Sequence, residues 1–296
     1  MIGVFDSGVG GLSILRVLRQ RLPEAEYLYL ADQGHVPYGP RPLLEVRGFA
    51  EGITRYLLSQ GADLIVVACN TASAAALHFL RQTFPRTPFV GMEPAVKPAA
   101  ERTRTGVVGV LATPATFQGE LYASVVERFA QGVTVLQDTC PGLVEQIEAG
   151  ATRSPRTRAI LEGALTPMLA QGIDTVVLGC THYPFVMPLI REIAGPEVRV
   201  IDPAPAIARQ TERLLRRHHL PITGAAPGRV RFATTGNAEL FREAIQTLLG
   251  ESAPQVESLI WERGVIKPGN LPGRPTAASK REASETQRFL EKDERL

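Results

Sequence analysis

Lysine is scarce in this chain, and its scarcity excludes one large class of enzymes. Only Lys97 lies in the body of the chain, whereas Lys267, Lys280 and Lys292 lie towards the C-terminus. A pyridoxal phosphate enzyme needs a lysine for its Schiff base. Lys97 stands directly before a proline in PAVKPAA and is an unpromising candidate. We therefore expect no pyridoxal phosphate, which is the commonest cofactor for chemistry at the α-carbon of an amino acid.

Cysteine is also scarce, with three residues at positions 69, 140 and 180. An odd number without a C-x-x-C pair does not indicate a disulfide framework or a dithiol redox motif, and we expect free thiols in a reducing compartment. No cluster of cysteine and histidine has the spacing of a zinc site. The cysteine pattern therefore predicts no zinc site.

Long apolar runs and a large charge excess are missing as well. No run reaches membrane-spanning length, and the net charge is only +2, with basic residues spread along the chain. We expect no membrane partner and no nucleic-acid partner. The first residues, MIGVFDSGVGG, have no basic region and no cleavage site, which predicts a cytoplasmic protein. The length of 296 residues allows one large domain or two ordinary ones.

What the chain does contain is an internal repeat. Residues 51–71 read EGITRYLLSQGADLIVVACNT, and residues 162–182 read EGALTPMLAQGIDTVVLGCTH. Each copy predicts a helix, a Gln-Gly turn, an apolar strand and then a cysteine followed by polar residues. Cys69 and Cys180 occupy the same place in the two copies. Two equivalent thiols suit a reaction in which one group removes a proton and its twin returns one from the other side.

Strand-like and helix-like segments alternate along the chain, which predicts an α/β fold with mainly parallel sheets flanked by helices. The repeat predicts two similar domains. We expect residues 1–92 and 206–262 to form the first and residues 93–205 to form a second, inserted one. Residues 263–296 read as a flexible, charged tail. The expected strands are Ile2–Phe5, Tyr27–Ala31, Leu64–Ala68, Phe89–Gly91, Gly106–Leu111, Val133–Gln137, Thr175–Gly179, Val198–Ile201, Val230–Ala233 and Ser258–Trp261.

Ligands of parallel sheets bind at the carboxyl ends of the strands, and polar residues follow four of the expected strands. A lone cysteine there is more often a buried apolar residue, but the duplication favours a function for Cys69 and Cys180. A helix start after each cysteine is expected to lower the thiol pKa. His182 could hold or shuttle a proton beside Cys180. Cys140 has no such context and is expected to be structural.

Other polar residues have two readings each. Asp6 could cap a helix, or it could orient or activate Cys69. Glu148 reads from sequence alone as part of a solvated helix face. Several residues could donate hydrogen bonds to a carboxylate, although each alone could be a turn or cap residue. They are Ser7, Asn70, Thr71, Thr181 and the backbone of Tyr38 and Gly39.

Four motifs then carry a resemblance to a known family. DSGVGGLSIL, D-x-x-x-x-PYG from Asp32, ACNTASA and GCTHYP occur in this order. From Ile2 to Trp261 the chain resembles the bacterial glutamate racemases of the aspartate/glutamate racemase superfamily. The resemblance implies a cofactor-independent enzyme that interconverts L- and D-glutamate and supplies D-glutamate for peptidoglycan. It also implies two α/β domains related by a pseudo-twofold axis, with glutamate bound in the cleft between them, and a possible homodimer by analogy.

The resemblance also implies roles for single residues. Cys69 would act on the D-isomer and Cys180 on the L-isomer, with Asp6 and His182 as their auxiliary residues and Glu148 assisting the second cysteine. The substrate-binding residues would be Asp6, Ser7, Tyr38, Gly39, Asn70, Thr71, Thr181 and His182. The chain departs from many members at His35, where they have arginine, and at Glu145, where they have proline.

Three other functions stay open on the sequence. Racemisation of aspartate or another amino acid, or a decarboxylation, could use the same scaffold, although GCTHYP favours glutamate. A thiol redox or peroxide-reducing enzyme is disfavoured because C-x-x-C is missing. A two-lobed binding module would keep the hydrogen-bond donors but would have no need for both thiols.

Overall fold

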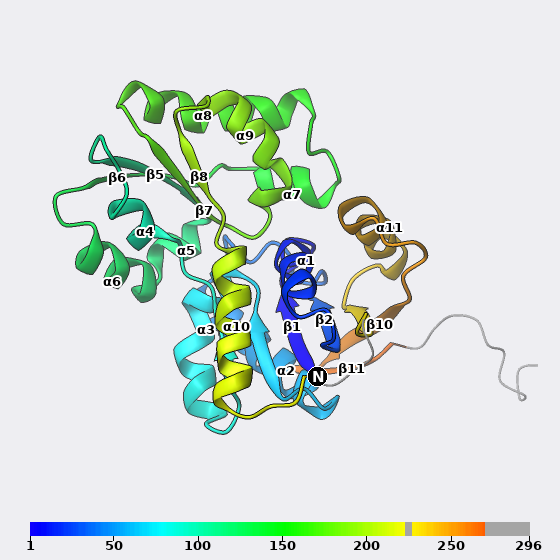
Figure 1. Ribbon diagram of the computed structural model, residues 1–296. Coiled ribbons are helices and arrows are strands. Elements are labelled where there is room, and N and C mark those ends of the chain that lie inside the picture. Colours follow the sequence, from blue (N-terminus) through cyan, green and yellow to red (C-terminus); the bar gives the residue numbers. More distant parts are fainter. Residues whose placement is uncertain (223–226, 270–296) are drawn as a thin grey trace, which may run out of the picture.

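The computed structural model describes residues 1–222 and 227–269, and within them the strands form two sheets (Figure 1). The larger has the order β11-β10-β9-β2-β1-β3-β4 and the smaller the order β6-β5-β7-β8. All neighbouring strands are parallel except β10 and β11. The strands are β1 (Ile2–Asp6), β2 (Tyr27–Ala31), β3 (Leu64–Val67), β4 (Phe89–Val90), β5 (Val107–Ala112), β6 (Thr134–Asp138), β7 (Thr175–Gly179), β8 (Arg199–Ile201), β9 (Val230–Thr234), β10 (Val256–Glu262) and β11 (Val265–Pro268).

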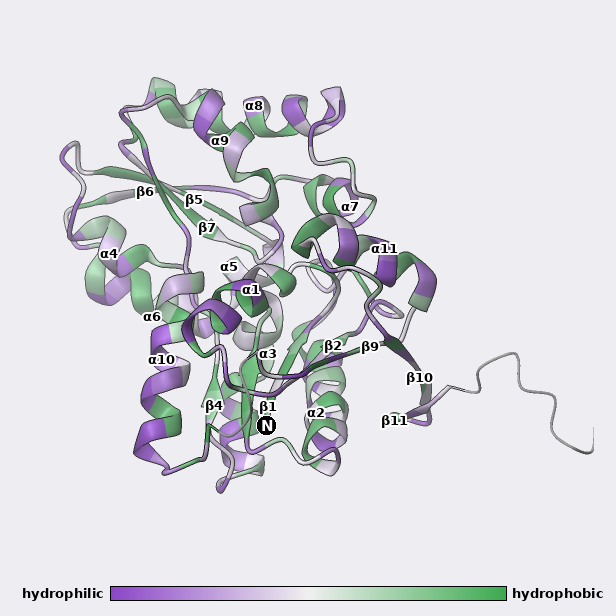
Figure 2. Cartoon of the chain, turned by 45° about the vertical axis from the view of Figure 1, so that its right-hand side comes forward, coloured by the Kyte–Doolittle hydropathy of each residue, from purple (hydrophilic) through white to green (hydrophobic). Residues whose placement is uncertain are grey.

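Helices cover these sheets. In the smaller sheet, α8 and α9 lie on one side and α4 and α6 on the other (Figures 1 and 2). In the larger part, α1 packs with α10 and α2 packs with α3. The helices are α1 (Leu12–Arg21), α2 (Leu43–Ser59), α3 (Asn70–Thr83), α4 (Val96–Ala100), α5 (Pro114–Gln118), α6 (Glu120–Phe129), α7 (Leu143–Glu148), α8 (Pro155–Ala170), the 3₁₀ helix η1 (Tyr183–Val186), α9 (Met187–Ala194), α10 (Ala204–Arg217) and α11 (Ala238–Leu249).

The central strands are buried on both faces, as their unbroken apolar sequences predict. Every residue of β1, β2, β3 and β7 is buried, and β1 and β7 are largely apolar in Figure 2. Neighbouring residues of β1 point to opposite faces. Val4 belongs to the core that includes α1 and α10, whereas Phe5 belongs to the core that includes α2 and α3. The α/β class with mainly parallel, helix-flanked sheets is therefore confirmed.

The two copies of the repeat occupy equivalent places. Strands β2-β1-β3-β4 of the larger sheet and β6-β5-β7-β8 of the smaller one follow the same order, and the repeated strands are β3 and β7. Strands from residues 1–92 lie in the larger sheet, as do those after residue 206, and strands from residues 93–205 lie in the smaller one. The domain boundaries themselves stay a prediction, and this division of strands agrees with them.

The prediction that a flexible tail begins at residue 263 is wrong. Strand β11 (Val265–Pro268) pairs antiparallel with β10 through a two-residue connection, with Glu262 opposite Val265. Arg263 and Gly264 both have positive φ, at 50° and 79°, as a tight hairpin turn requires. Hairpin turns of this length prefer asparagine, aspartate or glycine at their first position. The arginine at position 263 therefore gives no sequence signal for the hairpin. Residues 270–296, the rest of that tail, lie outside the described residues.

Alanine in place of each of two glycines in α2 is expected to have opposite effects on stability. A Cβ atom on Gly48 would meet nothing within 4 Å, whereas one on Gly52 would lie 2.6 Å from the Trp261 ring. We expect Gly48→Ala to raise the free energy of unfolding by about 0.5–1 kcal/mol, because alanine loses less backbone entropy in a helix. Gly52→Ala is the matched control in the same helix and should lower it. Urea unfolding of both variants checks this, and stabilisation by both would contradict the packing of Trp261 on α2.

Candidate active site

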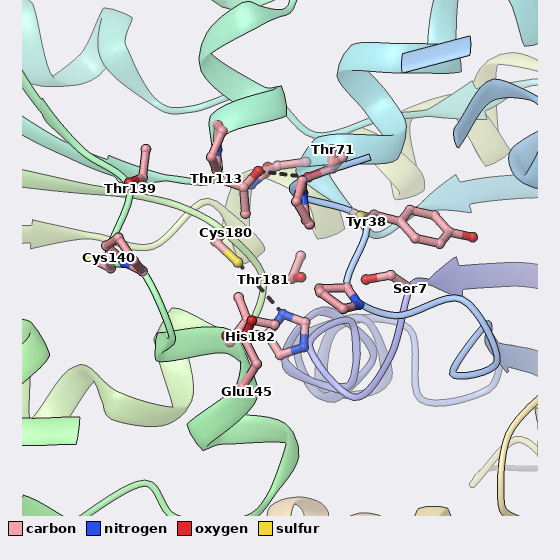
Figure 3. A pocket seen from close by; sticks show the side chains of 18 of the residues that line it. Ser7, Tyr38, Thr71, Thr113, Thr139, Cys140, Glu145, Cys180, Thr181 and His182 are labelled. Atoms are coloured by element: carbon pink, nitrogen blue, oxygen red, sulfur yellow. Dashed lines mark hydrogen bonds between the residues drawn. The ribbon is translucent and has the colours of Figure 1, made fainter. Parts of the chain in front are cut away.

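One cavity of about 240 Å³ lies at the carboxyl ends of strands from both sheets (Figure 3). The larger sheet contributes Ser7 after β1, Tyr38 and Gly39 after β2, and Cys69, Asn70 and Thr71 after β3. The smaller sheet contributes Thr113 after β5, Cys140 after β6, and Cys180, Thr181 and His182 after β7. The two cysteines of the repeat thus share a single cavity, one from each sheet.

Cys69 stands at the start of α3 as its N-cap residue. Its Sγ accepts a hydrogen bond from the Ala72 N–H at 3.4 Å. Burial nevertheless raises the pKa of Cys69 well above its ordinary value, and the nearby Asp6 carboxylate raises it further. The sequence-based expectation that the helix start would lower this pKa is wrong. The N–H does favour the thiolate, but desolvation and the like charge outweigh it.

Cys180 stands at the end of a chain of polar contacts. Its Sγ lies 3.7 Å from Nδ1 of His182, and Nε2 of the same ring lies 2.6 Å from the Glu148 carboxylate. Burial alone would lower the pKa of His182, but the hydrogen bonds and charges of Cys180 and Glu148 outweigh burial and raise it well above its ordinary value. The ring of His182 lies between a sulfur atom and a carboxylate, and both neighbours favour its protonated form.

The Glu148 side chain is largely buried and does not lie on a solvated helix face. Besides His182, its carboxylate accepts hydrogen bonds from the Val9 N–H at 2.8 Å and from Nε2 of Gln33 at 3.3 Å. Burial alone would raise the pKa of Glu148, but His182 and these donors lower it. The solvated reading failed because Val9 and Gln33 come from the N-terminal part of the chain, far from α7 in sequence. Glu148 thus joins a helix of the smaller sheet to loops of the larger one.

Asp6 lies close enough to Cys69 for its charge to act on the thiol, and it accepts hydrogen bonds from the backbone before α1. That it orients or activates Cys69 stays a prediction. Its carboxylate accepts hydrogen bonds from the N–H groups of Gly8 at 3.2 Å and Gly11 at 2.9 Å, which lie at the start of α1. Thr181 Oγ1 lies 3.4 Å from the other oxygen. Burial raises the pKa of Asp6, although His182 and the two N–H groups oppose this. Asp6 can therefore carry a proton beside Cys69 under conditions in which an exposed aspartate would not.

Asn70 is the residue of this site with the least satisfied side chain. It is 3% exposed and lines the cavity. Among the described residues, neither its Nδ2 nor its Oδ1 has a hydrogen-bond partner. A buried amide without partners costs free energy in the empty protein. Asn70 therefore points to a polar ligand that supplies both an acceptor and a donor.

Sequence reasoning missed Thr113, which follows β5. Its hydroxyl lies 2.8 Å from that of Thr71 and 2.9 Å from that of Thr116, so it links the two sheets at the wall of the cavity (Figure 3). The signal in the sequence is the threonine that follows the expected strand in VLATPA, at the same place as the donors after the other strands. Glu145, one of the departures from the family pattern, also lines the cavity and is exposed.

The structure also bears on a metal site and on a membrane-spanning helix. Across residues 1–222 and 227–269, no three histidine, cysteine, aspartate or glutamate side chains are grouped so that they could hold a metal ion. Within the same ranges, none of the helices combines the length and apolar character that crossing a membrane requires.

The fold and the cavity define a class: an α/β protein that binds a small molecule where the strand ends of two similar sheets meet. The family model for Asp/Glu/Hydantoin racemase matches residues 12–211. Glutamate racemase of Roseiflexus sp. (strain RS-1) is 52% identical over 248 residues, which cover 83% of this chain and 91% of that protein. The chain therefore belongs to the Asp/Glu/hydantoin racemase family.

Solved structures agree with this family. Glutamate racemase isoform RacE1 from Bacillus anthracis is 31% identical, with a TM-score of 0.78, over 90% of this chain and 98% of that one. Glutamate racemase from Francisella tularensis in complex with D-glutamate is 28% identical, with a TM-score of 0.76, over 87% of this chain and 96% of that one. The similarity therefore covers both sheets and is not confined to one domain.

Proposed function

We propose that the protein is a glutamate racemase that interconverts L- and D-glutamate without a cofactor, using Cys69 and Cys180 as its two acid–base groups. The observation that carries the proposal is that two thiols from the two copies of the repeat line one cavity. The relatives named glutamate racemase, and the similar structure that holds D-glutamate, support glutamate as the substrate. A binding module would not need the second thiol.

The proposed reaction has two proton transfers at one carbon. Cys69, as thiolate, takes the α-proton of D-glutamate, and the thiol of Cys180 gives a proton to the opposite face of the planar intermediate. Cys180 is then a thiolate and Cys69 a thiol, so a second turnover in the same direction requires that Cys69 lose its proton to Asp6 or to solvent. His182 returns a proton to Cys180 and takes its own back from solvent. The reverse reaction exchanges the two roles. The contact between Glu148 and His182 favours the protonated ring, so His182 can supply a proton to Cys180 on that side.

Substrate binding is assigned to the polar groups around the two thiols. We propose that Asn70 pairs with the substrate's α-amino and carboxylate groups, because its buried amide offers both a donor and an acceptor. The hydroxyls of Ser7, Thr71 and Thr181 are further donors, as are the N–H groups of the Tyr38–Gly39 turn. Asn70 and the three hydroxyls stabilise the negative charge that develops when the α-proton leaves, whereas the Tyr38–Gly39 turn binds ground state and transition state alike.

The biological setting is part of the proposal. We propose that the enzyme acts in the cytoplasm as a possible homodimer, without a nucleic-acid partner, and supplies D-glutamate for peptidoglycan. We also propose the discontinuous first domain (residues 1–92 and 206–262) and the inserted second domain (93–205). Limited proteolysis, which cuts between independently folded parts, and sedimentation at several concentrations test the domains and the oligomeric state.

The direct test is circular dichroism of purified protein with L-glutamate and no added cofactor. The signal should decay to zero as the racemic mixture forms, at a rate much higher than for L-aspartate. In deuterated water the D-glutamate product should carry deuterium at the α-carbon, because the proton it receives comes from a different sulfur than the one that took the first. Racemisation of aspartate alone, or peroxide reduction without racemisation, rejects the proposal.

A further inference from the structure

The substrate-binding turn Tyr38–Gly39 rests on a buried carboxylate that lies outside the cavity. Asp32, the first residue after β2, is wholly buried. One of its oxygens accepts a hydrogen bond from the Tyr38 hydroxyl at 2.6 Å and lies 2.9 Å from Nδ1 of His35. Tyr38 is itself 1% exposed, and its ring points away from Cys180 (Figure 3). The Tyr38 side chain is therefore an anchor, while its backbone lines the cavity.

The other oxygen of Asp32 is held by residues from β9, which lies next to β2 in the larger sheet, and from β10, which is the next strand beyond it. It accepts hydrogen bonds from Thr235 Oγ1 at 2.6 Å and from Nε1 of Trp261 at 2.7 Å. Thr235 follows β9 and Trp261 belongs to β10, so these donors come from the last part of the described chain. A buried carboxylate is stable only when its oxygens are paired, and this one is paired on both. The position of the Tyr38 hydroxyl thus depends, through Asp32, on Thr235 and Trp261, which are 203 and 229 residues from Asp32 in sequence.

Aromatic packing fixes the same side chains. The His35 ring stacks on Phe49 at 4.0 Å between ring centroids and meets the edge of Trp261 at 5.4 Å. On the opposite side of the turn, Gly39 contacts α5, which follows strand β5 of the smaller sheet. The Gly39 carbonyl accepts a hydrogen bond from the Ala115 N–H at 3.3 Å. The turn is thus held between an anchor in the larger sheet and a contact with α5.

We infer that Trp261 and Asp32 are positioning residues for glutamate: the indole N–H fixes the Asp32 carboxylate, which fixes Tyr38 and with it the backbone N–H groups that face the substrate. Neither residue lines the cavity. This inference rests on the proposed function, because it assigns a partner to the Tyr38–Gly39 turn. It places part of the substrate affinity in β10, outside every motif that carries the family resemblance.

The test removes one hydrogen-bond donor at a time. Tyr38→Phe and Trp261→Phe each keep an aromatic ring and take one donor from Asp32. Each should raise KM for both enantiomers by about tenfold, the effect of one hydrogen bond to a charged group. The value of kcat should change by less than about threefold, because the turn binds ground state and transition state alike. The double variant should show less than the product of the two effects, since both act through Asp32.

Tyr27→Phe is the matched control. Tyr27 is also buried in β2, and its hydroxyl donates to the Leu22 carbonyl at 3.0 Å without contact with Asp32. It should lower the melting temperature about as much as Tyr38→Phe but leave KM unchanged. An unchanged KM in Trp261→Phe, or equal KM effects in Tyr27→Phe and Tyr38→Phe, overturns the inference. Racemisation by the unmodified protein is measured separately, so failure of the inference is distinguishable from failure of the proposed function.

Fluorescence gives a second readout. Trp261 is the only tryptophan in the chain, so its emission reports on this network alone. Titration with D-glutamate should shift the emission of the unmodified protein and saturate near KM. Tyr38→Phe interrupts the connection between the cavity and the indole, and its shift should be several-fold smaller at saturation. An undiminished shift in Tyr38→Phe overturns the inference.

Discussion

Alanine in place of either Cys69 or Cys180 is expected to reduce racemisation about 10³-fold or more in both directions. Each positioned acid–base group contributes roughly 10²–10⁴-fold to a rate, and racemisation needs both groups in every turnover. The structure explains why neither can substitute for the other, because one thiol follows β3 of the larger sheet and the other follows β7 of the smaller. Circular dichroism with each pure enantiomer measures the loss.

The two variants should differ in a partial reaction. A protein with one remaining thiolate can still remove the α-proton of the enantiomer that faces it and return a deuteron from the solvent to the same side. Cys180→Ala should therefore exchange the α-hydrogen of D-glutamate faster than that of L-glutamate in deuterated water, and Cys69→Ala should show the reverse preference. Proton NMR of the recovered substrate measures this exchange. Equal exchange of both enantiomers by one variant would contradict the assignment of sides.

Cys140 provides a matched control for this experiment. It lines the same cavity and is also buried, but it is not part of the repeat. Its backbone N–H donates to Asp138 at 2.7 Å, and burial raises the pKa of its thiol. Cys140→Ala should keep racemisation within several-fold of the unmodified protein. A loss as large as that of Cys69→Ala would show that position in the cavity, and not position in the repeat, decides which thiols act.

The sequence predicted the parts of the fold that local patterns encode. Apolar runs such as LIVVA and TVVLG predicted buried parallel strands, and the repeat predicted that Cys69 and Cys180 would occupy equivalent places. Both copies indeed lie second from one end of a run of four strands in the same order. Because ligands meet parallel sheets at the carboxyl ends of strands, the shared cavity follows from these two predictions together.

The missed features are contacts between residues far apart in the chain. The Glu148 carboxylate is satisfied by Val9 and Gln33, and Asp32 by Thr235 and Trp261. No periodicity or spacing encodes such pairs, so the helix pattern alone predicts a solvated face for Glu148, and only the family resemblance predicts a role for it beside the second cysteine. The direction of the Cys69 pKa shift was missed for the same reason, because burial and the neighbouring carboxylate depend on tertiary packing and outweigh the local helix start.

Glu148→Gln is expected to give the second largest effect, a loss of roughly tenfold to a hundredfold in kcat/KM, because it weakens one acid–base pair without removing it. Glutamine keeps the size of the side chain and can still contact Val9 and Gln33. It removes the negative charge that, with Cys180, holds the pKa of His182 well above its ordinary value. The imidazolium should then lose its proton at lower pH. The alkaline limb of the kcat/KM profile should move to lower pH accordingly.

Glu145→Gln is the control from the same helix. Glu145 precedes Glu148 by about one turn, lines the cavity and is exposed, and no hydrogen bond joins it to His182 among the described residues. It removes the same charge from α7 and should leave the alkaline limb in place. An equal shift in both variants would mean that general electrostatics at the cavity, and not the contact between Glu148 and His182, sets the profile.

The same pair predicts how stability depends on pH. The raised pKa of His182 stabilises the fold fully below its ordinary value of 6.5 and ceases to do so as pH rises through the folded value. The lowered pKa of Glu148 stabilises the fold above its ordinary value of 4.5 and ceases to do so as pH falls through the folded value. Both contributions are complete only between these two pH values, so the melting temperature of Glu148→Gln should fall furthest below that of the unmodified protein there. The difference should shrink in alkali, where the unmodified protein loses the imidazolium as well; a difference that stays constant with pH would show that the variant only disturbs packing.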